Sequence, residues 1–275
     1  MSLETGLNQA WRAIVDDAAI FPPGNAPLHE ATAAYGARTA AEGADLVGSF
    51  VLKDTDLPLV RGVQMPLSVV VTGGAGQLAG PVELGHRLGL HLAGLEIALR
   101  DLDDLAGNAR RVVAALSQVE DDLPVFVELP QAPLSSGWLA AADVVAEAEL
   151  SLKFRTGGLD ASAYPSVETL AGWIDASLDR ETAFKCTAGL HNAVRHTGED
   201  GFEHHGFLNV LLATRRAFDG APIEEVVALL DQRSPEALVA AATDQDLAGA
   251  RRWFTSFGSC SVIEPWDDLR QLGLI

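Results

Sequence analysis

The segment AFKCTAGLH, residues 183–191, decides how this chain is interpreted. It has the pattern of a short buried strand that ends in a turn of small residues and continues into a short helix. A similar segment, LSLKFRTGG, occupies residues 150–158. Each segment places a lysine within an otherwise apolar strand and continues through threonine to glycine. Because the chain has three lysines in 275 residues, two lysines on such strands indicate a site rather than solvated surface residues.

The composition limits the classes of protein to which this chain can belong. Its length suits one large domain or two small ones, and α/β barrels commonly reach about 250 residues as one domain. The formal net charge of −19 argues against nucleic acid or an anionic membrane as a partner, because both require a basic face. No apolar run reaches the roughly 18 residues of a membrane span, and no secretion signal is visible. Cys186 and Cys260 are too few for a disulfide framework, so we expect a cytoplasmic protein.

Strand candidates recur along the chain, with helical patterns between most of them. Helical spacing of apolar residues predicts helices over residues 102–116 and 167–178, the second after a capping Ser166. Ser234 and Pro235 provide the cap and first-turn proline with which helices begin. The eight predicted strands cover residues 45–53, 67–72, 92–100, 124–129, 150–156, 183–187, 207–212 and 254–261.

This alternation predicts a (β/α)8 barrel of the TIM type with parallel strands and a single domain, residues 1–275. Residues 1–44 are interpreted as an N-terminal helical extension, with a helix over residues 7–15, and residues 45–275 as the barrel. An open doubly wound sheet is the alternative. The Gly-x-Gly-x-x-Gly fingerprint expected after the first strand of such a sheet is absent, which favours the barrel.

Strand alternation separates the residues that face the barrel interior from those that face the helices. Phe154, Phe184 and Cys186 fall on the outward faces. Buried charges cost several kcal/mol each unless they are paired, and the inward charges gather at the end of the barrel where enzymes of this fold bind substrates. A purely structural lattice of ion pairs is the alternative interpretation. The predicted catalytic residues on the inward faces are Lys185, Lys153, Glu128 and Glu96.

The turns that follow the two lysine strands add donors for an anionic ligand. Backbone N–H groups at such turns suit a carboxylate or a phosphate. His191 lies just past a strand, where an acid or base role is possible, and is predicted as catalytic. The histidines of this region lack the spacing of zinc motifs, so we expect no cofactor, with a divalent metal as an alternative. The predicted substrate-binding residues are Arg155, Thr156, Gly157, Gly158, Thr187 and Asn209.

Five motifs resemble those of a family of uncharacterised bacterial proteins. They are Phe-Pro-Pro at 21–23, Lys-x-Arg-Thr-Gly-Gly at 153–158, Phe-Lys-x-Thr-Ala-Gly-Leu-His at 184–191, His-Gly-Phe-Leu-Asn at 205–209 and Gly-Ser-Cys-Ser at 258–261. The resemblance spans most of the chain and departs at Asn192, where the family pattern has a second histidine. It implies no activity, so the function must be inferred from the residues.

These residues favour a lyase or aldolase-like enzyme that acts on a small anionic metabolite with a carbonyl group. A lysine on the sixth strand beside a second cation resembles the arrangement in class I aldolases, where a Schiff base forms. Lys185 is the predicted nucleophile, Lys153 the cation that lowers its pKa, and Arg155 the clamp on the substrate anion. Glu128 or Glu96 is the predicted proton-transfer group.

Two other functions use the same residues. One is a non-covalent acid/base enzyme that stabilises an enolate, with or without a metal held by Glu96 and Glu128. The other is a barrel that binds a small anion without catalysis. The chain is also compatible with a homo-oligomer.

Overall fold

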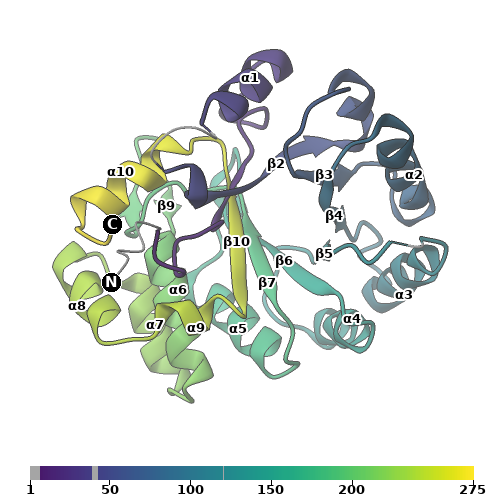
Figure 1. Cartoon of the computed structure of the whole chain (residues 1–275). Helices are drawn as coiled ribbons and strands as arrows, with labels where there is room; N and C mark the ends of the chain where they lie inside the picture. Colours follow the sequence, from purple (N-terminus) through teal and green to yellow (C-terminus); the bar gives the residue numbers. More distant parts are fainter. Residues whose placement is uncertain (1–6, 39–42, 120) are drawn as a thin grey trace, which may run out of the picture.

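The computed structural model describes residues 7–38, 43–119 and 121–275, and its centre is a closed barrel of parallel strands (Figure 1). Because β1 pairs with both β2 and β10, the sheet closes on itself. The predicted (β/α)8 barrel is therefore confirmed. Around the barrel, the strands are β1 (Val15–Asp17), β10 (Phe254–Ser259), β7 (Phe184–Thr187), β6 (Ser151–Arg155), β5 (Val125–Glu128), β4 (Leu92–Ala98), β3 (Leu67–Val71) and β2 (Val47–Lys53).

Helices surround the barrel (Figure 1). The predicted cap at Ser166 is confirmed, because its Oγ accepts a hydrogen bond from the Thr169 N–H at 3.2 Å. Ser234 caps its helix in the same way. In the part of the chain that the structure describes, no helix has the length and apolarity needed to cross a membrane. The helices are α1 (Leu28–Arg38), α2 (Ala79–Leu88), α3 (Leu105–Leu116), α4 (Ser136–Glu147), α5 (Val167–Leu178), α6 (Phe207–Phe218), α7 (Ile223–Asp231), α8 (Pro235–Thr243), α9 (Leu247–Ala250) and α10 (Ile263–Gln271), with short 3-10 segments η1 (Ala44–Leu46), η2 (Asp54–Leu59), η3 (Ala75–Gln77) and η4 (Ala161–Ala163).

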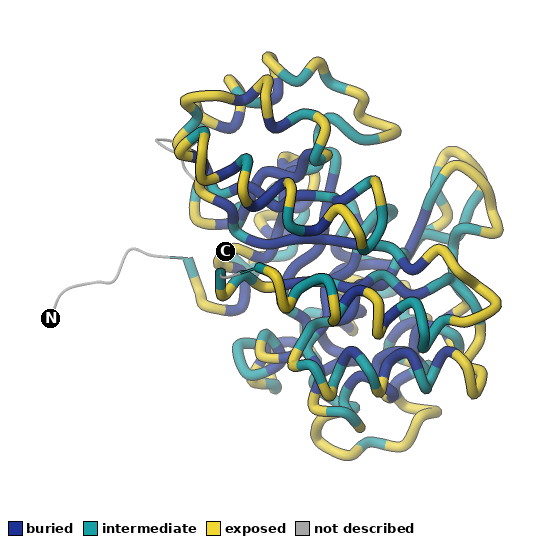
Figure 2. Tube along the Cα trace, turned by 90° about the vertical axis from the view of Figure 1, so that its right-hand side faces the viewer, coloured by how far each residue is buried: buried dark blue, intermediate teal, exposed yellow. Residues whose placement is uncertain are grey.

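The outward faces of β6 and β7 pack under the helices, as predicted. The Phe154 ring lies 5.5 Å from the Trp173 ring of α5 and 6.3 Å from the Trp138 ring of α4. The Phe184 ring lies 4.9 Å from that of Phe154. Figure 2 shows buried residues running through the middle of the molecule and exposed residues on the surrounding helices and loops. A shift of one residue would turn these rings into the lumen, so the predicted register of both strands is correct.

The first barrel strand is β1, and not the strand predicted at residues 45–53. The helix predicted over residues 7–15 is not formed, because residues 9–13 form turns. Val15–Asp17 pairs instead with Phe257 to Ser259 of β10. The predicted N-terminal extension therefore contributes a strand to the barrel before α1 begins. As a consequence, Lys153 stands on the sixth barrel strand and Lys185 on the seventh, each one position later than predicted.

Residues 207–212, predicted as a strand, form the first half of α6 instead. Every residue from Phe207 to Thr214 is buried, so this part of the helix has no face exposed to solvent. An apolar run of this length fits a buried strand and a buried helix equally well by periodicity. Asn209, predicted to face the lumen from a strand, therefore lies on a helix.

Candidate functional site

Lys185 is held inside the barrel by two carboxylates. Its Nζ donates to Asp16 Oδ2 at 2.7 Å and to Glu96 Oε1 at 2.6 Å. Asp16 in turn accepts hydrogen bonds from the hydroxyl groups of Ser49 and Ser256, both at 2.6 Å. Lys185 thus faces the interior as predicted. Asp16 is a partner that the sequence analysis missed, because β1 was not recognised as a strand.

Lys153 continues this series of charges toward solvent. Its Nζ lies 2.9 Å from Glu96 Oε2 and 2.8 Å from Glu128 Oε2, and Arg155 Nε donates to Glu128 Oε1 at 2.7 Å. The exposed fraction of the side chain rises from 2% at Lys185 to 38% at Arg155. We call this series of alternating charges the charge ladder; its members are Asp16, Lys185, Glu96, Lys153, Glu128 and Arg155.

The alternation shifts the proton affinities of neighbouring ladder members in opposite directions. Burial alone would raise the pKa of Glu96, but Lys153 and Lys185 lower this pKa to about 2. Burial would lower the pKa of both lysines, but their carboxylate partners raise it above the usual range. Both lysines and Glu96 are therefore charged at neutral pH. The prediction that Lys153 lowers the pKa of Lys185 is wrong, because the two lysines share the Glu96 carboxylate that lies between them.

A cavity of about 840 Å³ lies over the ladder at the carboxyl ends of the strands. Glu96, Glu128, Lys153, Arg155 and Lys185 all line it. With histidines counted as neutral, its charged lining is balanced between the two signs, whereas the whole chain carries a formal charge of −19 on the same count. The cavity is therefore much less negative than the molecule around it. Its four lysine and arginine lining residues are Arg100, Lys153, Arg155 and Lys185, and its four anionic ones are Glu96, Glu128, Asp160 and Asp200.

The predicted substrate-binding residues divide into two groups. Thr156 is buried, and its Oγ1 donates to the Ala188 carbonyl at 2.6 Å, which ties the loop after β6 to the loop after β7. A Cβ on Gly157 would lie 2.8 Å from Gly189 Cα, so glycine allows the two loops to touch. Thr156 is thus a structural residue of these loops. The predicted residues that line the cavity are Arg155, Gly157, Gly158 and Thr187.

His191 lies on the rim of the cavity between a cysteine and a glutamate. Its Nδ1 is 2.8 Å from Glu264 Oε2 of α10, and its Nε2 is 3.6 Å from Cys260 Sγ. Burial lowers the pKa of His191, but Cys260 and Glu264 outweigh burial and raise this pKa to about 9. His191 is therefore a cation at neutral pH. Cys260 was not predicted as a site residue, and the Gly-Ser-Cys-Ser motif around it was the available signal.

A hairpin of β8 (His196–Thr197) and β9 (Glu203–His204) lies beside the cavity. His204 lines the cavity together with Asp200 and Tyr164. Its Nε2 is 3.0 Å from Asp200 Oδ2, and its ring lies 4.7 Å from the Tyr164 ring. The strand predicted over residues 207–212 would have placed His204 at the opposite end of the barrel, where that strand would begin.

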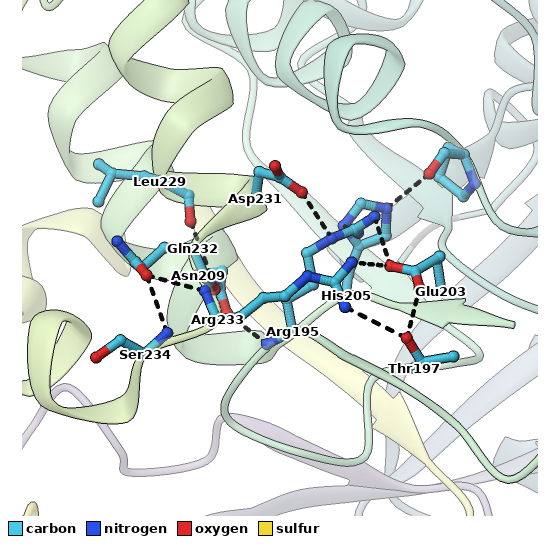
Figure 3. A network of polar contacts seen from close by, with 11 residues as sticks. Arg195, Thr197, Glu203, His205, Asn209, Leu229, Asp231, Gln232, Arg233 and Ser234 are labelled. Atoms are coloured by element: carbon cyan, nitrogen blue, oxygen red, sulfur yellow. Dashed lines mark hydrogen bonds and ion pairs between the residues drawn. The ribbon is translucent and has the colours of Figure 1, made fainter. Parts of the chain in front are cut away.

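A polar network attaches the base of this hairpin to α6 and α7 (Figure 3). Asn209 Oδ1 accepts a hydrogen bond from the Arg195 N–H at 2.9 Å, and its Nδ2 donates to two backbone carbonyls at the end of α7, at 2.8 and 2.7 Å. His205 Nδ1 accepts from Arg195 Nη1 at 3.3 Å, and burial lowers the pKa of His205 to about 4. Asn209, predicted to bind substrate, is thus a structural residue of this network.

The carboxylates of the ladder do not fit the predicted metal alternative. Both oxygens of Glu96 contact ammonium groups, and the two oxygens of Glu128 contact Lys153 and Arg155. A divalent ion there would add further positive charge beside two cations. Within residues 7–38, 43–119 and 121–275, no three His, Cys, Asp or Glu side chains are grouped to hold a metal ion.

No protein-family model matches this chain, and a search of curated proteins finds no significant match. The site itself brings four of the five motifs behind the bacterial resemblance together, because residues from 21–23, 153–158, 184–191 and 258–261 all line the cavity. The fifth motif, at 205–209, contains His205 and Asn209 of the network that holds the hairpin. Four of the motifs thus belong to one site, and the fifth supports the hairpin beside it.

Proposed function

We propose that the protein is an enzyme of the lyase or aldolase type that acts on a small anionic carbonyl compound, with Lys153 as its reactive lysine. The observation that carries the proposal is the charge ladder, which lies at the carboxyl end of the barrel and is open to a cavity. Aliphatic residues can replace buried ion pairs with little loss of stability, so stability alone does not explain the ladder. The open cavity favours catalysis over a barrel that only binds an anion.

The corrected strand count changes which lysine is the candidate nucleophile. Lys153, and not Lys185, now stands on the sixth strand with a second cation on the next strand, as in the class I aldolase arrangement. Lys185 has the shorter ion-pair contacts of the two lysines, because its Nζ lies 2.7 Å from Asp16 and 2.6 Å from Glu96. Lys153 adjoins the Glu128–Arg155 pair, where the ladder meets solvent. Lys185 therefore supplies a fixed positive charge.

Lys153 must lose a proton before it can attack a carbonyl group. Its Nζ lies 2.8 Å from Glu128 Oε2, so Glu128 is the proton acceptor on the solvent side of the ladder. When a substrate anion binds the Arg155 guanidinium, the electrostatic interaction of Arg155 with Glu128 becomes weaker. The pKa of Glu128 therefore rises. Glu128 then takes the proton, and the Lys153 amine condenses with the carbonyl group to form an imine and release one water.

A second candidate function is favoured by the raised pKa of both lysines. In this function, the lysines remain ammonium groups and stabilise the enolate oxygen of a bound substrate without a covalent bond. Glu128 is then the base that removes a proton from the carbon next to the carbonyl group.

Reduction with borohydride separates the two functions, because it traps an imine and leaves an enolate complex unmodified. The protein is incubated with small keto acids and aldehydes that carry a carboxylate or a phosphate, reduced, and mapped by peptide mass spectrometry. We expect an adduct on Lys153, which Lys153→Met abolishes. Lys185→Met should reduce trapping roughly tenfold, because Glu96 then has Lys153 as its one ammonium partner and holds the Lys153 proton more tightly, by about one pKa unit. The attachment point should stay the same. Lys53→Met, at an exposed lysine, is the matched control.

Other outcomes of the same experiment decide against parts of the proposal. An adduct on Lys185 would reverse the roles of the two lysines. Absence of any lysine adduct, together with exchange of substrate α-protons with solvent deuterium, would replace the imine by the enolate function. Arg155→Lys should weaken trapping of the imine or, for the enolate function, the exchange of α-protons, because an ammonium group lacks the planar fork that binds a carboxylate through two hydrogen bonds.

A further inference from the structure

Cys260 and His191 form a pair on the cavity rim that the proposed lysine chemistry does not use. Cys260 Sγ lies 3.6 Å from His191 Nε2, and His191 Nδ1 lies 2.8 Å from Glu264 Oε2. Cys260 Sγ also lies 3.9 Å from His191 Nδ1, so the sulfur faces the imidazole ring between its two nitrogens. The Glu264 carboxylate orients the ring and stabilises a positive charge on it, and this charge lies beside the thiol.

The turn after β10 fixes the positions of both the thiol and the carboxylate. Ser259 Oγ donates to the Ser261 carbonyl at 2.6 Å, and Ser261 Oγ accepts from the Glu264 N–H at 3.3 Å. On the other side of the thiol, a Cβ on Gly24 would lie 2.9 Å from Cys260 Cβ, so only glycine fits there. Segments around residues 24, 191 and 260 therefore meet at Cys260.

The two cysteines of the chain differ in each property that matters for reactivity. Cys186 is fully buried on the outward face of β7, and burial raises the pKa of its thiol. Cys260 is partly exposed and lines the cavity beside the cationic His191. Glu264 is the acidic group paired with His191 among the residues that the structure describes. A neighbouring imidazolium favours the thiolate form of a cysteine.

We propose that Cys260 is a second nucleophile of the cavity, a thiolate paired with the His191 imidazolium that adds to the carbonyl carbon of a small anionic aldehyde. The class of ligand rests on the proposed function, whereas the ion pair does not. In the addition, a C–S bond forms, the π electrons of the carbonyl group move to its oxygen, and the Nε2 proton of His191 passes to that oxygen. The product is a hemithioacetal, and no oxidant or other co-reactant is consumed.

Alkylation by iodoacetamide at neutral pH tests the ion pair, because the thiolate is the form that reacts. We expect Cys260 to react roughly tenfold faster in the wild type than in His191→Gln, which lacks the imidazolium that favours the thiolate. Glu264→Gln should slow the reaction less. Cys186 should stay unmodified, which reports that the fold is intact. His29→Gln, at an exposed histidine of α1, is the matched control and should change nothing. A rate of Cys260 alkylation that His191→Gln leaves unchanged overturns the proposal.

Glyoxylate, a small anionic aldehyde, tests the class of ligand. We expect glyoxylate to slow alkylation of Cys260 at neutral pH, and we expect oxalate, an anion of similar size without an aldehyde, not to slow it. Glyoxylate should still protect Cys260 from alkylation in Lys153→Met, because the adduct forms on sulfur. This result does not depend on imine formation at Lys153. Equal protection by the two anions, or loss of protection in Lys153→Met, would overturn addition at Cys260.

Discussion

At the scale of single residues, Glu96 is the centre of the charge ladder. Each of its oxygens contacts a different lysine, Lys153 at 2.9 Å and Lys185 at 2.6 Å. Its pKa of about 2 in the folded chain lies below the ordinary value of 4.5. Its contribution to stability is therefore present above about pH 4.5 and is lost as the pH falls toward 2.

We expect Glu96→Gln to lower the free energy of unfolding by about 3–5 kcal/mol at neutral pH, because it leaves two buried ammonium groups with one carboxylate each. Urea unfolding measures the change. Glu147→Gln, at an exposed position of α4, is the control and should stay within ~0.5 kcal/mol. Adding Lys153→Met to Glu96→Gln should recover part of the loss, since Glu128 keeps Arg155 as a partner. A double variant whose loss equals the sum of the two single losses would contradict this prediction.

At the scale of elements, the sequence predicts strands well where apolar alternation is regular. The alternation of β6 and β7 placed both lysines and Glu128 correctly inside the barrel. β1 could not be predicted in this way, because two of its three residues are aspartates, which are depleted in strands. Their burial depends on distant partners, since Asp16 pairs with Lys185 and Asp17 with Arg38.

The missed parts of the site also depend on contacts between distant segments. Cys260 meets His191 across 69 residues of sequence, and no local pattern around either residue indicates the contact. The position of His204 beside the cavity depends on α6, whose buried first half has the composition of a strand. Periodicity reports which face of an element is buried, but it cannot report which loops meet above a barrel.

Asn209 is the residue on which the attachment of the hairpin can be tested. We expect Asn209→Ala to lower the free energy of unfolding by roughly 1–3 kcal/mol, because a buried N–H and two carbonyl groups lose their partner. Hydrogen exchange across residues 195–206 should become faster as the hairpin loses its anchor. Gln118→Ala, at an exposed position, is the control. Unchanged exchange across the hairpin would show that other contacts hold it.

At the scale of the whole molecule, negative charge is concentrated outside the cavity. With histidines counted as neutral, the formal charge of the chain is −19, while the lysines and arginines of the cavity lining balance its aspartates and glutamates. Repulsion among exposed charges of one sign destabilises a compact state and is weakened by salt. The ladder is buried, so salt should affect it much less.

Raising sodium chloride from ~10 to ~150 mM shortens the Debye length from about 30 to about 8 Å. We expect the Tm, measured by calorimetry at neutral pH, to rise over this range. The difference in Tm between the wild type and Glu96→Gln should stay the same at both salt concentrations, because the lost contacts are buried. A Tm that falls with salt would indicate that exposed ion pairs outweigh the repulsion.

The closure of the barrel by β1 and β10 has a consequence for synthesis of the chain. Asp16 on β1 meets Ser256 on β10 across 240 residues of sequence. At ribosomal rates of about 5–20 residues per second, roughly 10–50 s pass between the translation of the two strands. During that time the first strand has no partner on one side, and open strand edges invite pairing with other chains. The nascent chain must therefore be kept from aggregating for tens of seconds before its barrel can exist.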